Sequence, residues 1–121
     1  MELNFLNSKG VVELNYYEKS HDSETITFTV NISHAPFMAK MIISYTKEEL
    51  LLLDHGLKSM KHFRLKTFTF ASINRVLVVT LNMDSSGHIN TMVTVSAGSR
   101  GYLKFDFDSD QTIIDKIMVT D

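Results

Sequence analysis

The chain has 121 residues, of which 44% are hydrophobic and 21% are charged, with no cysteine and a formal net charge of −2. A chain of this length can build a core without a disulfide or a structural metal, so we expect one α+β domain spanning residues 1–121. The absence of cysteine excludes thiolate zinc sites, iron–sulfur clusters and catalytic thiols. The charge argues against electrostatic binding of nucleic acid, since such domains usually carry a basic excess.

The N-terminus carries an acid at Glu2 and has no apolar run behind a basic residue, so we expect no secretory signal. Apolar runs such as Leu50–Leu53 are far shorter than the roughly 20 residues of a membrane span. We therefore expect a cytoplasmic protein that makes no use of a membrane.

The first part of the chain predicts four strands. Short stretches at Leu3–Leu6 and Val11–Tyr17 have β-branched, aromatic and alternating character, and a loop through Ser20–Ser23 follows. In Thr25–Ile32 every even position is apolar and every odd position is polar, which predicts a strand with one buried face. Met38–Tyr45 is apolar on both sides, and this predicts a more central strand.

A helix is predicted over residues 47–62. Thr46 and Glu49 form a capping box, in which the threonine hydroxyl accepts from the third helical amide. An apolar stripe follows at spacings of three and four, formed by Leu50, Leu53, Leu57 and Met60. Gly56 inside the helix indicates close packing against a sheet. We expect this helix to cover sheet residues Ile26, Phe28, Val30, Leu103 and Phe105.

The second part of the chain predicts a meander of antiparallel hairpins, with strands at Thr67–Ala71, Val76–Asn82, Ile89–Ser96 and Tyr102–Phe107. Turn-forming residues separate the last three strands at Asp84–Gly87 and Ala97–Gly101. The acids of Asp108–Gln111 precede the apolar residues Ile113, Ile114, Ile117 and Met118, which predicts a short capped C-terminal helix. The fold class is therefore α+β with a mainly antiparallel sheet.

No catalytic or metal-binding constellation is found. None of the five histidines has the spacing of a metal site. The acids Asp106, Asp108 and Asp110 resemble the opening of a calcium loop, but Gln111 replaces its glycine and Ile117 its glutamate. The cluster at His21–Glu24 is more consistent with a loop than with a catalytic triad. We expect no metal, no cofactor and no enzymatic activity.

Strand alternation assembles one mixed outer face. If Leu103, Phe105 and Phe107 point inward, the outward side chains are Asn90, Met92, Thr94, Tyr102, Lys104 and Asp106. Aromatic, thioether, amide and charged groups together suit a protein interface. A sheet face that is merely solvated fits the same residues equally well.

The order of features resembles the small immunity proteins of bacterial polymorphic-toxin and contact-dependent inhibition systems, particularly the WapI-type immunity group. The resemblance runs from Thr46–Leu50 at the helix start, through Phe68–Phe70 and Val76–Leu81, to Leu103–Phe107 and Asp110–Thr112. It implies a binder that covers a cognate toxin domain, often a nuclease, and carries no catalytic residue. We expect the partner surface to comprise the mixed outer face with Asp22, Glu24, Asp84 and Asp108. Carboxylates suit a basic nuclease because they mimic phosphate, and the acids available for this are Glu13, Glu18, Asp22, Glu24, Asp84, Asp106, Asp108 and Asp110.

Two other function classes stay open. A small-ligand-binding or enzymatic domain would use a pocket between the helix and a curved sheet, with Tyr16, Tyr17, Tyr45 or His34 as polar handles. An adaptor would bind by adding a strand at an exposed sheet edge. The sequence does not specify the toxin, the surface used or the oligomeric state.

Overall fold

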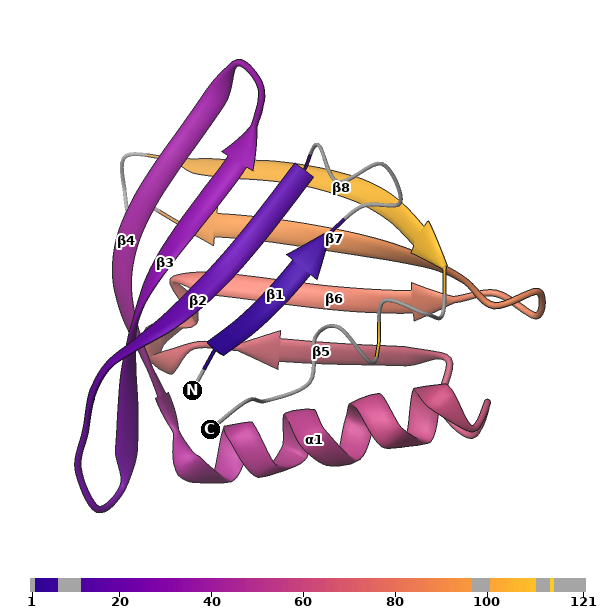
Figure 1. Cartoon of the computed structure of the whole chain (residues 1–121), viewed down its shortest axis with the longest axis horizontal. Coiled ribbons are helices and arrows are strands. Elements are labelled where there is room, and N and C mark those ends of the chain that lie inside the picture. The colour runs from indigo at the N-terminus through magenta and orange to yellow at the C-terminus, as the bar shows by residue number, and fades with distance from the viewer. Residues whose placement is uncertain (1, 7–11, 97–100, 111–113, 115–121) are drawn as a thin grey trace.

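The computed structural model describes residues 2–6, 12–96, 101–110 and 114, and it contains two antiparallel sheets of four strands each (Figure 1). The first sheet comprises β1 (Glu2–Leu6), β2 (Val12–His21), β3 (Thr25–His34) and β4 (Phe37–Thr46). The second comprises β5 (Thr67–Ala71), β6 (Leu77–Met83), β7 (His88–Ser96) and β8 (Tyr102–Asp110). Helix α1 (Lys47–Lys61) connects the sheets, and the short helix η1 (Ile73–Arg75) lies between β5 and β6. The predicted α+β class with mainly antiparallel sheet is confirmed.

The two sheets pack face to face, with the strands of the first running diagonally across those of the second (Figure 1). The period-two pattern predicted for β3 is confirmed, because Ile26, Phe28, Val30 and Ile32 are all buried. β6 alternates in the same way and buries Leu77, Val79, Leu81 and Met83. Removal of these apolar side chains from water, at roughly 25 cal/mol per Å², is the main force that holds the sheets together.

Helix α1 begins where the capping residues predict. The Thr46 hydroxyl accepts a hydrogen bond from the Glu49 amide at 3.1 Å, and the apolar stripe is buried. The helix lies beside β5 and also contacts β4 (Figure 1). The expectation that it covers Leu103 and Phe105 is wrong, because these residues lie on β8, at the opposite edge of the second sheet. No helix among the described residues has the length and apolar character needed to cross a membrane.

β4 is an edge strand, which corrects the expectation of a central one. It ends the order β1-β2-β3-β4, so β3 is its only partner strand in the described part of the chain. One side of β4 buries Ile43 and Tyr45 against the core, whereas Met38 and Ile42 on the other side are 83% and 58% exposed. Apolar residues on both sides of a strand therefore mark an uncovered apolar surface here, rather than burial on both sides.

The end of the chain corrects a second expectation. Asp108 and Asp110 do not begin a helix but continue β8, opposite Asn90 and His88 of β7. The strand continues because the alternation of buried and exposed residues extends through Ser109, which is only 3% exposed. Of the predicted C-terminal helix, Ile114 is described and is helical and buried, while the rest lies outside the described residues. Most of the predicted turn at 97–101 also lies outside them.

Candidate functional site

The predicted outer face lies on the second sheet. We call it the second-sheet face, and it comprises Asn90, Met92, Thr94, Tyr102, Lys104, Asp106 and Asp108 of β7 and β8. Direct cross-strand pairs join these residues, with Met92 opposite Asp106 and Thr94 opposite Lys104. Residues on the same side of the neighbouring strands extend the face with Thr67, Thr69, Val78, Thr80 and Asn82. The structure thus brings the predicted β7 and β8 residues together on one surface.

Hydrogen bonds order the side chains of this face. The Asn90 amide nitrogen donates to Asp106 Oδ2 at 2.9 Å and to Asp108 Oδ1 at 3.0 Å, so one amide holds two carboxylates. Further along the sheet, the Thr67 hydroxyl donates to Asn82 Oδ1 at 3.0 Å. Side chains held in this way lose little further conformational freedom when a partner binds.

Asp84 lies in the β6–β7 turn, near the end of the sheet where Asp108 also lies. Its Oδ1 accepts from the Ser86 hydroxyl at 2.7 Å, from the Ser86 amide at 2.9 Å and from the His88 amide at 3.0 Å. These bonds, the Ser86 hydroxyl foremost, lower the pKa of the Asp84 carboxyl below its usual range. Asp84 therefore stabilises the turn and adds a negative charge at the edge of the face.

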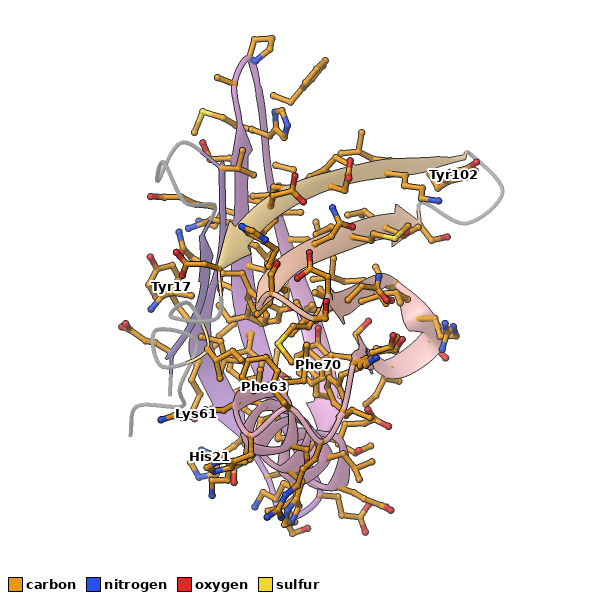
Figure 2. The ribbon with its side chains drawn as sticks, turned by 90° about the vertical axis from the view of Figure 1, so that its right-hand side faces the viewer. Tyr17, His21, Lys61, Phe63, Phe70 and Tyr102 are labelled. Atoms are coloured by element: carbon orange, nitrogen blue, oxygen red, sulfur yellow. The ribbon has the colours of Figure 1, made fainter. Side chains whose placement is uncertain are left out.

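Asp22 and Glu24 are not part of this surface. They lie in the β2–β3 turn, and Figure 2 shows the adjacent His21 and the labelled Tyr102 at opposite corners of the molecule. The Asp22 carboxylate accepts from the Glu24 and Thr25 amides, each at 2.8 Å, and these bonds lower its pKa. The Glu24 carbonyl also accepts from the first helical amide, of Lys47, at 2.9 Å. This part of the chain forms a structural turn.

The predicted tyrosine handles lie in three different environments. Tyr16 and Tyr45 are fully buried between the sheets, where their hydroxyl groups share a hydrogen bond of 2.7 Å and burial raises both pKa values. Tyr17 lies on the outer side of the first sheet (Figure 2). His34 stacks edge-on against Phe105, with ring centroids 5.5 Å apart. Tyr16 and Tyr45 therefore do not line an open pocket, because both side chains belong to the packed core.

The surface of the protein has two hollows that the sequence did not predict. One, of about 530 Å³, lies on the outer side of the first sheet and is lined by residues that include Asn15, Tyr17, Asn31 and Lys40. The other, of about 250 Å³, lies between the β3–β4 hairpin and β8, and we call it the hairpin groove. Its lining is mostly apolar and includes Ile32, His34, Phe37, Met38, Leu103 and Phe105. The sequence signal for it was the apolar character of both sides of residues 37–45.

One cluster in the β6–β7 turn has the composition of a catalytic triad but not its geometry. His88 Nδ1 lies 2.8 Å from the Ser86 hydroxyl and 3.6 Å from Asp84 Oδ2. Because both groups meet the same ring nitrogen, the imidazole cannot pass a proton between them as a triad histidine does. The described residues also contain no group of three or more side chains that could hold a metal ion.

The comparisons with known proteins give no family. No protein-family model matches the chain, and no curated protein matches it. Among solved structures, the chain is similar to MRP1/MRP2 of Trypanosoma brucei, at 8% identity over 96% of this chain and 78% of that chain. The TM-score is 0.47, and a likeness at this level carries no argument about fold or function.

Proposed function

We propose that this protein is an immunity protein that binds a cognate toxin domain and neutralises it by covering it stoichiometrically in the cytoplasm. The observation that supports the proposal best is the second-sheet face, whose side chains combine apolar, amide and charged groups in a hydrogen-bonded arrangement. Such a combination favours protein recognition, since the polar groups fix the register of a partner and the apolar groups exclude water.

The charge distribution favours a basic partner. Asp106, Asp108 and Asp110 lie on one side of β8, and Asp84 lies in the turn near the end of that strand. A nuclease that binds phosphates carries a basic surface, and a row of carboxylates matches it. Such complementarity accelerates encounter more than it adds to the final affinity.

Co-expression with candidate toxin domains from the neighbouring genes tests the proposal. We expect protection of the host cell and a stable complex that contains both chains. No binding and no protection would refute the immunity role, as would turnover of a small substrate by the protein at an enzyme-like rate.

A charge reversal on the face tests how the toxin is bound. Asp108→Lys should lower the association rate by about threefold to tenfold at low salt and weaken its salt dependence, because an exposed charge acts mainly on encounter. Glu24→Lys is the matched control, since it makes the same charge change in the β2–β3 turn, away from the face. Equal slowing by both variants would show that net charge, rather than this face, governs association.

A further inference from the structure

No strand among the described residues pairs with the outer edge of β8. The second sheet has the order β5-β6-β7-β8, so β8 pairs with β7 on one side only. The opposite edge, at β5, lies beside α1 (Figure 1). A strand at the edge of a sheet, with a neighbouring strand on one side, is a template for a further strand on the other.

The β3–β4 hairpin projects beyond this edge, as both views show (Figures 1 and 2). Phe37 alternates with the inward residues Ile43 and Tyr45, so it faces the side of the first sheet that packs on the second. The second sheet ends at β8 and does not cover Phe37, which is 67% exposed. Leu103, at the start of β8 across the hairpin groove, is 42% exposed. One more strand beside β8 would cover both side chains.

We propose that this strand is β8 of a second copy of the chain, paired antiparallel about a two-fold axis at Phe105. In this register Lys104 lies opposite Asp106 of the second copy, and symmetry repeats the pair. Leu103 lies opposite Phe107 of the second copy, so apolar residues face apolar residues on the inner side. The dimer has a continuous sheet across the axis and two uncovered second-sheet faces.

The charged side chains of β8 favour this register over the neighbouring registers. Residues that lie opposite each other in an antiparallel pair are on the same face of the sheet. A two-fold axis midway between two residues of β8 would therefore place inward residues of one copy opposite outward residues of the other, and the apolar side of the second copy would be exposed. An axis at Lys104 places two lysines opposite each other, and an axis at Asp106 places two aspartates opposite each other. An axis at Phe107 places Asp106 opposite Asp108. An axis at Asp106 or at Phe107 also pairs Lys104 with an aspartate, but the axis at Phe105 alone does so without placing like charges opposite each other. This complementarity is the reason to infer a second copy rather than an unrelated strand.

The proposal does not depend on a toxin partner, and sedimentation of the purified protein alone tests it. The wild type should sediment as a dimer, at twice the chain mass of 13.8 kDa. Lys104→Asp and Asp106→Lys should each raise the dissociation constant at least about tenfold, because each places like charges opposite each other twice. A mixture of the two variants should associate again, since the aspartate introduced in one chain then meets the lysine introduced in the other.

Controls separate the edge from general charge effects. Lys19→Asp makes the same change as Lys104→Asp on β2, near the β2–β3 turn, and should leave the dimer intact. Lys104→Gln keeps a polar side chain and should weaken the dimer less than Lys104→Asp does. Thermal melting of each variant checks that it folds. The proposal would be overturned by a monomeric wild type, by a dimer that neither charge reversal affects, or by a mixture of the two variants that stays monomeric. Capture of a strand from another protein in place of the second copy would overturn the choice of partner.

Discussion

Tyr16 and Tyr45 carry two polar hydroxyl groups into a mostly apolar layer. Each hydroxyl has the other as its partner at 2.7 Å, and the Tyr45 ring stacks on Phe70 of the second sheet with centroids 4.2 Å apart. The pair therefore satisfies its hydrogen bonds within the first sheet while its rings fill space between the sheets. A buried hydroxyl that loses its only partner costs about 1–3 kcal/mol, which makes the two residues energetically dependent on each other.

Substitution of either tyrosine by phenylalanine tests this dependence. Tyr16→Phe and Tyr45→Phe should each lower the free energy of unfolding by about 1–3 kcal/mol, because each leaves one buried hydroxyl unpaired. The double variant should lose less than the sum of the two, since it removes both hydroxyls. Urea denaturation of the four proteins measures the coupling, with Tyr17→Phe as the exposed control. Additive losses would show that the hydroxyls do not depend on each other.

At the residue scale, the sequence predicts side-chain direction better than it predicts neighbours across the fold. Period-two alternation is a local property, so Asn90 and Met92 could be placed on the outer face of β7 correctly. Asp22 and Glu24 were grouped with that face on charge alone. Their actual position depends on how the two sheets cross, which no local pattern specifies.

Helix α1 shows how one small residue determines the packing of a whole element. Gly56 lies against the Phe68 ring of β5, and a Cβ at this position would overlap the ring. The helix also buries Leu53 and Met60 completely. The absence of a side chain at residue 56 thus lets the helix approach β5 closely enough to bury its apolar stripe.

Gly56→Ala should therefore destabilise the protein although alanine is the better helix former. The gain in helix propensity is about 1 kcal/mol, and overpacking against the ring should exceed it, giving a net loss of about 1–2 kcal/mol. Phe68→Leu in the same chain should recover part of the loss by making room for the methyl group. His55→Ala, at an exposed position in the same turn, should be nearly neutral or slightly stabilising. A more stable Gly56→Ala variant would contradict the close packing.

At the element scale, the sequence predicts most strands and the helix because caps and alternation are encoded locally. It fails where the same pattern has two meanings. Apolar residues on both sides of β4 fit burial on both sides, but the strand lies at an edge and exposes Met38. Acids followed by an apolar run fit a helix N-terminus, but Asp108 and Asp110 pair with β7.

At the scale of the whole molecule, the crossing of two sheets leaves two kinds of surface with different character. The second-sheet face is polar and acidic along β8, whereas the hairpin groove is mostly apolar. Pairing of β8 with a second copy would cover the groove without covering the face. The proposed toxin binding and the proposed self-association therefore use different surfaces, and each can be measured by itself.

The measurement that tests the central claim most directly is methyl NMR of the methionine side chains during titration with the toxin domain that co-expression with neighbouring genes identifies. Met92 is half-buried within the second-sheet face, Met38 lines the hairpin groove and Met60 is fully buried in the core. We expect the Met92 signal to shift as the complex forms, while the Met60 signal stays in place. A complex that forms with Met92 unchanged, and with Met38 shifted instead, would contradict binding through the second-sheet face.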